Sequence, residues 1–300
     1  MLRTQALEAY IAPARAYPAF WRIIVGIATG FGVYMFGATF ILWFGFEPLT
    51  RIFPEMEGMD AFTLIYGNGT TPGQMALILA TFIPMGLAAF AMAAWHWRGP
   101  ASILGPKTGF ARNFFIAIAV LAAANIIFFV VERLIAPAVY TPNLPFAAWT
   151  KNLIWAVPLL FIQTTSEELV FRGYLLQQLA ARFNNPLIWM LLPALLFGAG
   201  HYDNTIDPKL ALLVVFATTL FGVIAADLTR VTGSLAAAMG LHFANNFVAL
   251  LLVGVPGELS GLALYHAPFT MEDTSVLVNY IFLDIAVLSL IWIVVRRMLR

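Results

Sequence analysis

The chain has 300 residues, of which 61% are hydrophobic and 10% are charged, and its mean hydropathy is +0.86. Soluble domains carry about 25% charged residues, so this composition predicts an integral, multi-pass membrane protein with the lipid bilayer as a partner. The net charge of +1 argues against a nucleic-acid partner, and the absence of cysteine excludes disulfides, thiolate metal sites and a cysteine nucleophile.

Apolar runs long enough to cross about 30 Å of hydrocarbon predict an all-α bundle of about eight transmembrane helices. The predicted spans are 23–46, 74–95, 114–131, 152–180, 186–201, 209–227, 232–253 and 276–295. The first run is too long for the core of a cleavable signal peptide, so a retained span is expected there. The run at 186–201 is short and the run at 152–180 contains charges, so both depend on the motifs described below.

Basic residues predict the orientation of the bundle, because cytoplasmic segments of membrane proteins are enriched in lysine and arginine. With the N-terminus in the cytoplasm, twelve basic residues fall on the inner side and four on the outer side. The four outer residues are Arg51, Arg133, Lys151 and Lys209. Both termini are therefore predicted to be cytoplasmic, in the cell or inner membrane if the source is bacterial.

The predicted spans divide the chain into three parts. Residues 1–150 hold the first three helices and an outer loop at 47–73, whose glycines and prolines predict irregular structure with one short interfacial helix around 62–66. Residues 151–253 hold helices four to seven and the polar motifs. Residues 254–300 hold an outer loop and the final helix.

Three polar clusters interrupt the apolar spans of the central part. The first contains Glu167, Glu168 and Arg172, the second is Phe197 to His201, and the third is His242 to Asn246. Ionisable groups at membrane depth are costly, so such clusters indicate a functional site. At about 1.5 Å per residue, all three lie roughly 18 to 24 Å above the inner ends of their helices, which places them in one layer.

The motifs EExxxR, FxxxH and HxxxN, in this order, resemble those of the CPBP intramembrane proteases. This family includes CAAX prenyl endopeptidases and bacterial bacteriocin-processing or self-immunity proteins, and the resemblance covers roughly Lys151 to Leu252. It implies an intramembrane endopeptidase whose FxxxH histidine, His201, works with the first glutamate, Glu167. The implied substrates are membrane-associated CAAX-type, leader-bearing or bacteriocin-like peptides.

Peptide hydrolysis needs an activated water, and a desolvated carboxylate such as Glu167 can act as its general base. His242 and Asn246 are one turn apart on a helix and are predicted to stabilise the developing oxyanion. Arg172 lies at i+4 from Glu168, so these two residues are predicted to pair and to play a structural or tuning role.

The metal requirement stays open at this point. Glu167, His201 and His242 could serve as three ligands of a catalytic Zn²⁺ ion with a fourth position for water, whereas a metal-free mechanism would use the same residues. The HExxH helix of soluble zinc proteases is absent. The sequence does not predict an oligomeric state.

Other functions compete with the protease. A proton- or solute-coupled transporter would use Glu167, His201, His242 and the last-span carboxylate Asp284 as a relay, although a relay needs groups at several depths. A catalytically silent immunity or scaffold protein of the same fold is another alternative. In a purely structural interpretation, the glutamates and Arg172 form a buried ion-pair network that only stabilises helix packing.

Overall fold

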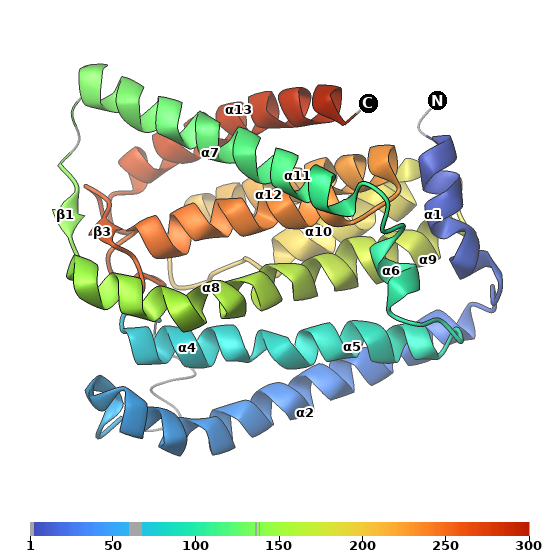
Figure 1. The fold of residues 1–300 in the computed structure, drawn as a ribbon, viewed down its shortest axis with the longest axis horizontal. Helices are drawn as coiled ribbons and strands as arrows, with labels where there is room; N and C mark the ends of the chain where they lie inside the picture. The colour runs from blue at the N-terminus through green and yellow to red at the C-terminus, as the bar shows by residue number, and fades with distance from the viewer. Residues whose placement is uncertain (1–2, 60–67, 136, 138, 300) are drawn as a thin grey trace.

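The computed structural model describes residues 3–59, 68–135, 137 and 139–299, and most of these residues lie in helices that run side by side (Figure 1). The N-terminal half contains α1 (Gln5–Arg15), α2 (Trp21–Ile52), the short 3₁₀ helix η1 (Pro54–Met56), α4 (Pro72–Ala80), α5 (Phe82–Ala94), α6 (Ala101–Leu104) and α7 (Phe110–Ile135). The remainder contains β1 (Thr141–Pro142), α8 (Phe146–Glu168), η2 (Leu169–Leu175), α9 (Leu176–Ala180), η3 (Leu187–Leu191), α10 (Leu192–Ala199), α11 (Pro208–Thr232), α12 (Ala236–Phe247), η4 (Val248–Leu252), β2 (Val253–Gly254), β3 (Tyr265–His266) and α13 (Thr274–Met298).

The prediction of a polytopic helical bundle is confirmed. Six described helices are long and apolar enough to cross a membrane, namely Trp21–Ile52, Pro72–Ala94, Phe110–Ile135, Phe146–Ala180, Pro208–Thr232 and Thr274–Met298. Two shorter apolar helices, Leu187–Ala199 and Ala236–Leu252, correspond to the other two predicted spans. Helix α1 and the C-terminal end of α13 lie at the same end of the bundle, which agrees with an even number of crossings (Figure 1).

Local sequence signals explain where several of these helices begin and end. Thr71 caps α4 through a capping box with Gln74, and Pro72 occupies the first helical position. The Asp207 side chain accepts hydrogen bonds from two backbone N–H groups at the start of α11. Gly233 ends that helix in the left-handed conformation, at φ 67°, which glycine adopts without a Cβ penalty.

Two features were not predicted from the sequence. Helix α1 precedes the first span and contacts α9 and α11, burying Leu7, Tyr10, Ile11 and Ala14. A small sheet of order β1-β3-β2 joins the loops at the opposite end of the bundle, with β1 antiparallel and β2 parallel to β3. The short helix predicted around 62–66 lies outside the described residues.

Three π-helical segments interrupt the spans of the central part. Segment η2 follows α8 directly after Glu168, η3 begins the span that leads to the FxxxH motif, and η4 follows the HxxxN motif. Such wide turns are rare and occur frequently at functional sites. Their positions therefore support a site in this part of the chain.

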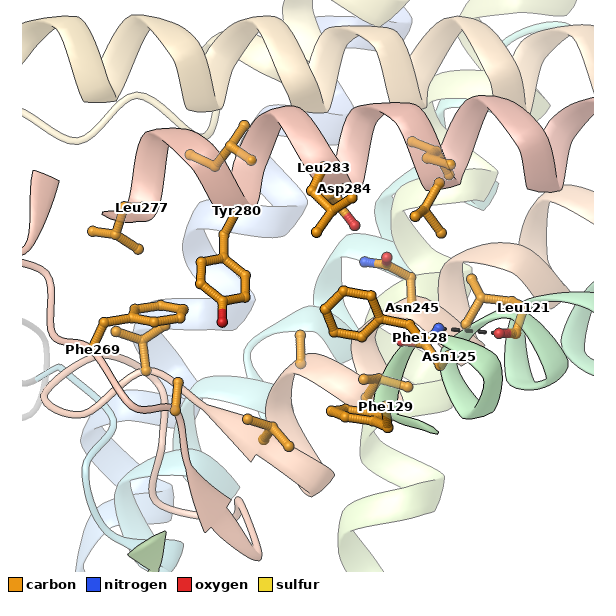
Figure 2. A pocket seen from close by; sticks show the side chains of 18 of the residues that line it. Leu121, Asn125, Phe128, Phe129, Asn245, Phe269, Leu277, Tyr280, Leu283 and Asp284 are labelled. Carbon is orange, nitrogen blue, oxygen red and sulfur yellow. Dashed lines mark hydrogen bonds between the residues drawn. The ribbon is translucent and has the colours of Figure 1, made fainter. Parts of the chain in front are cut away.

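Helices α7, α12 and α13, together with η4, surround a cavity of about 440 Å³ (Figure 2). Aliphatic and aromatic side chains make up most of its lining, and Asp284 from α13 and Asn245 from α12 project into it. This cavity is thus available to a ligand in addition to the polar motifs.

Candidate active site

The first polar cluster lies where α8 passes into η2. Glu168 and Arg172 are fully enclosed, at 0% and 1% exposed, and Arg172 Nη1 donates to Glu168 Oε1 at 2.9 Å. This is the ion pair that the four-residue spacing predicted. Removing either partner would leave an uncompensated charge inside the protein, so both residues are needed for the stability of this region.

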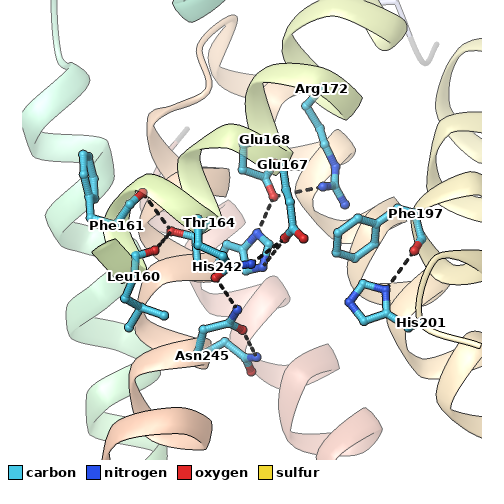
Figure 3. Close-up of polar contacts among 12 residues, drawn as sticks. Leu160, Phe161, Thr164, Glu167, Glu168, Arg172, Phe197, His201, His242 and Asn245 are labelled. Atoms are coloured by element: carbon cyan, nitrogen blue, oxygen red, sulfur yellow. Dashed lines mark hydrogen bonds and ion pairs between the residues drawn. The ribbon is translucent and has the colours of Figure 1, made fainter. Parts of the chain in front are cut away.

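His242 from α12 contacts both glutamates (Figure 3). Its Nδ1 lies 2.8 Å from Glu168 Oε1, and its Nε2 lies 3.3 Å from Glu167 Oε2. Glu168 Oε1 therefore serves Arg172 and His242 together, which extends its predicted pairing with Arg172 alone. The two nitrogen contacts fix the orientation of the imidazole ring against the Glu167 carboxylate.

His201 directly follows α10 and Gly200. It makes no hydrogen bond to Glu167 in the described part of the chain, and its Nδ1 donates to the Phe197 carbonyl at 2.9 Å. Figure 3 shows His201 on the side of the site that faces Glu167 and His242, next to the Phe197 ring. Since Nδ1 carries the proton, Nε2 of the neutral ring is left as an acceptor.

Asn246 is joined to Glu167 through a residue that the motifs did not include. Asn246 Nδ2 donates to Gln163 Oε1 at 3.0 Å, and Gln163 Nε2 donates to Glu167 Oε2 at 3.0 Å. Gln163 is 7% exposed and lies one turn before Glu167 on α8. The sequence could have indicated this role, because an amide four residues before a glutamate in an apolar span lies on the same face of the helix.

Phe197 begins the FxxxH motif, but the sequence analysis gave it no role in the site. Its ring lies 4.5 Å from Arg172 Cζ, 4.8 Å from the His201 ring and 5.8 Å from the His242 ring. Phe221 from α11 stacks on Phe197 at 6.1 Å and reaches His242 at 5.0 Å. These rings border the polar groups with apolar surface, which strengthens the electrostatic interactions among them.

The described residues do not fit the zinc site that the sequence left open. No group of three or more His, Cys, Asp or Glu side chains in the described part of the chain is arranged to hold a metal ion. Both nitrogens of His242 contact carboxylates, and His201 turns its Nδ1 to a backbone carbonyl. The metalloprotease expectation is not supported.

Asp284 lies apart from the motif residues. No described hydrogen bond or ion pair joins it to Glu167, His201 or His242, so the structure shows no continuous relay of the kind that the transporter alternative needs. Instead, Asp284 lines the cavity between α7 and α13.

Comparisons with known proteins agree with the motifs. Residues 149–248 match the family described as type II CAAX prenyl endopeptidase Rce1-like, which confirms the family resemblance over the segment that carries all three motifs. The uncharacterized protein YyaK of Bacillus subtilis (strain 168) is 32% identical over 151 residues, which are 45% of this chain and 49% of YyaK. The match thus spans about half the length of this curated relative. No solved structure matches the chain.

Proposed function

We propose that this integral, multi-pass membrane protein, whose residues 149–248 match the Rce1-like endopeptidases, is an intramembrane endopeptidase that acts on membrane-associated peptides. One observation carries the proposal: the buried Glu167 carboxylate lies within 3.0 to 3.3 Å of Gln163 and His242, with His201 facing it. Ionisable and polar groups gathered at membrane depth mark functional sites rather than packing.

In the proposed mechanism, Glu167 acts as the general base. Its carboxylate accepts a proton from a water whose oxygen bonds to the scissile carbonyl carbon, while the C=O electron pair moves to the carbonyl oxygen. His201 Nε2 is the acceptor that helps to orient this water. When the C–N bond breaks, Glu167 returns the proton to the leaving nitrogen.

The remaining polar residues support this reaction. His242 and Asn246 supply N–H groups for the oxyanion, where a single well-placed donor contributes about 3 kcal/mol. Glu168 and Arg172 are positioning residues, because the contact at 2.8 Å between Glu168 and His242 holds the ring in place. The substrate classes that fit are CAAX-type peptides and leader or bacteriocin-like peptides.

The decisive experiment compares the wild-type protein with Glu167→Gln. Both are reconstituted in phosphatidylcholine nanodiscs and incubated with a panel of farnesylated CAAX peptides and apolar leader peptides, and products are identified by mass spectrometry. We expect Glu167→Gln to lower the cleavage rate by about 10²- to 10⁴-fold, because the amide cannot accept the proton.

A matched control is Glu132→Gln, which changes a carboxylate on α7 that accepts hydrogen bonds from Tyr140 and Tyr280. This variant should cleave at the wild-type rate. Wild-type activity in Glu167→Gln would overturn the proposed role of Glu167, and absence of cleavage by the wild-type protein across the panel would count against the peptidase.

A further inference from the structure

The cavity between α7, α12 and α13 has the size of an ordinary ligand site. Its volume of about 440 Å³ falls within the roughly 300 to 1,000 Å³ of small-ligand pockets. Most of its lining is apolar, including Phe128, Phe129 and Leu283, and none of the described lining residues is lysine, arginine or histidine. A negative charge inside it therefore has no cationic neighbour.

Asp284 supplies such a charge. Figure 2 shows its side chain directed into the cavity, and no hydrogen bond or ion pair joins it to another residue in the described part of the chain. It follows the first residue of α13 by ten positions, which puts it about 15 Å along the span. Intramembrane carboxylates normally pair, so an unpaired one that lines a cavity indicates a cationic ligand.

Two asparagines complete a set of oxygen acceptors. Asn125 Nδ2 donates to the Leu121 carbonyl at 3.1 Å, and Asn245 Nδ2 donates to Asn246 Oδ1 at 3.2 Å. In each asparagine, the amide nitrogen donates to the protein and the amide oxygen can accept a hydrogen bond from a ligand. An ammonium group has three donors and no acceptor, so it matches Asp284 and the two amide oxygens.

The cavity also adjoins the candidate active site. Asn245 lines it, and its hydrogen-bonded neighbour Asn246 is connected through Gln163 to Glu167. The cavity and the candidate active site are thus linked through two consecutive residues of α12. An amine on a lipid headgroup lies at the membrane surface, about 15 Å from Asp284.

We propose that this cavity is a specificity subsite that binds a lysine side chain of the membrane-embedded substrate, with Asp284 as its counter-ion. The proposal rests on the proposed peptidase function and names a feature of its substrate. The lysine stem packs against the apolar lining while its ammonium reaches the carboxylate, as long basic side chains do in membranes.

The test is photo-crosslinking in phosphatidylcholine nanodiscs. The probe is an apolar peptide of about 20 residues with one central lysine next to a diazirine-bearing leucine, and the matched probe has norleucine in place of lysine. We expect the lysine probe to label residues of α7 and α13 that line the cavity about tenfold more than the norleucine probe does, the size of one charge-assisted contact. Asp284→Asn should abolish this difference, whereas Asp284→Glu should retain it.

Two control variants locate the effect. Glu47→Gln removes an exposed carboxylate on α2 that pairs with Arg51, outside the elements that line the cavity, and it should leave the labelling unchanged. Glu167→Gln should also leave it unchanged, because labelling needs no cleavage. If Asp284→Asn does not fold, the comparison of the two probes on the wild-type protein still tests whether the cavity prefers lysine.

Equal labelling by the two wild-type reactions, or a lysine preference that survives in Asp284→Asn, would overturn the subsite. Labelling by a phosphatidylethanolamine analogue that competes with the lysine probe would assign the cavity to lipid instead. Lysine-dependent labelling without any peptidase activity would refute the proposed peptidase function but not the lysine subsite. Cleavage without a preference for lysine would refute the subsite but not the peptidase function.

Discussion

Gln163 is the residue through which Asn246 and Glu167 act together. It donates to the carboxylate and accepts from the asparagine, both at 3.0 Å. In Gln163→Leu, both partners lose a hydrogen bond inside the span, so we expect kcat to fall by about tenfold to a hundredfold with little change in KM. Steady-state kinetics on any substrate that the wild-type protein cleaves would measure this.

The control for this substitution is Gln178→Leu. Gln178 is buried like Gln163, but it accepts from Arg182 near the end of α9, away from the site. Its loss should change thermal stability and leave kcat unchanged. Equal kcat values for the two variants would show that Gln163 has only a structural role.

At the residue scale, the sequence predicted the parts of the site that follow from spacing within one helix. The Glu168–Arg172 pair followed from the i,i+4 rule. Contacts between helices could not be predicted in this way, since they depend on how α8, α10 and α12 are rotated. This is why the sequence did not show that His242 contacts Glu167, nor that the Phe197 ring packs against Arg172 and both histidines.

Helices α10 and α11 approach closely at Gly198. A Cβ added there would lie 2.1 Å from Thr219 Oγ1 and 2.7 Å from the Val215 carbonyl oxygen. Because the second contact is backbone, Gly198→Ala must push the two helices apart, and we expect it to reduce the free energy of unfolding by about 1 to 3 kcal/mol.

Gly32 provides the matched control. It lies in α2 with nothing within 4 Å of an added Cβ, so Gly32→Ala should be neutral or stabilising by up to about 1 kcal/mol. Thermal unfolding in one detergent should rank Gly198→Ala below the wild type and Gly32→Ala at or above it. The reverse order would mean that α10 and α11 are not packed as described.

At the element scale, hydropathy predicted the spans well because the apolar runs are long. It did not predict that α2 continues past Pro48 to Ile52, nor that α1 forms before the first span. Helix α1 is short and packs through only four buried side chains, so its hydropathy does not distinguish it from a polar loop. The π segments also escaped prediction, because an apolar span does not show how many residues make up each turn.

His96 connects three parts of the molecule that are distant in sequence. Its side chain is fully buried after α5, with Nδ1 3.4 Å from the Tyr17 carbonyl oxygen and Nε2 3.0 Å from the Tyr174 hydroxyl. Burial, together with the smaller effect of the positive charges of Arg182 and Arg98, lowers the pKa of His96 from 6.5 to about 4.

This shift predicts a pH dependence for the whole fold. Between pH 6.5 and about 4, the unfolded chain binds a proton at this position that the folded protein excludes. The contribution of His96 to stability is therefore complete above pH 6.5 and is lost as the pH falls toward 4. Melting temperatures measured across this window should decline more steeply for the wild type than for His96→Gln, and parallel profiles would contradict the assignment.

The proposed orientation, with both termini in the cytoplasm, can be tested directly because the chain has no cysteine. Lys107 and Glu272 are exposed in connections that are predicted to lie on the inner and outer sides. In intact cells, a membrane-impermeant maleimide should label Glu272→Cys at once and Lys107→Cys only after permeabilisation. The opposite pattern would invert the bundle.

The π-helical segment η2 contains an extra residue compared with a regular α-helix. Each π turn holds one residue more than the α turn it replaces, so deleting one residue from 169–175 would restore a regular helix. The part of the span that follows would then rotate by about 100° relative to Glu167. Related proteins with a regular helix here should therefore align to this chain with a one-residue gap next to the glutamates.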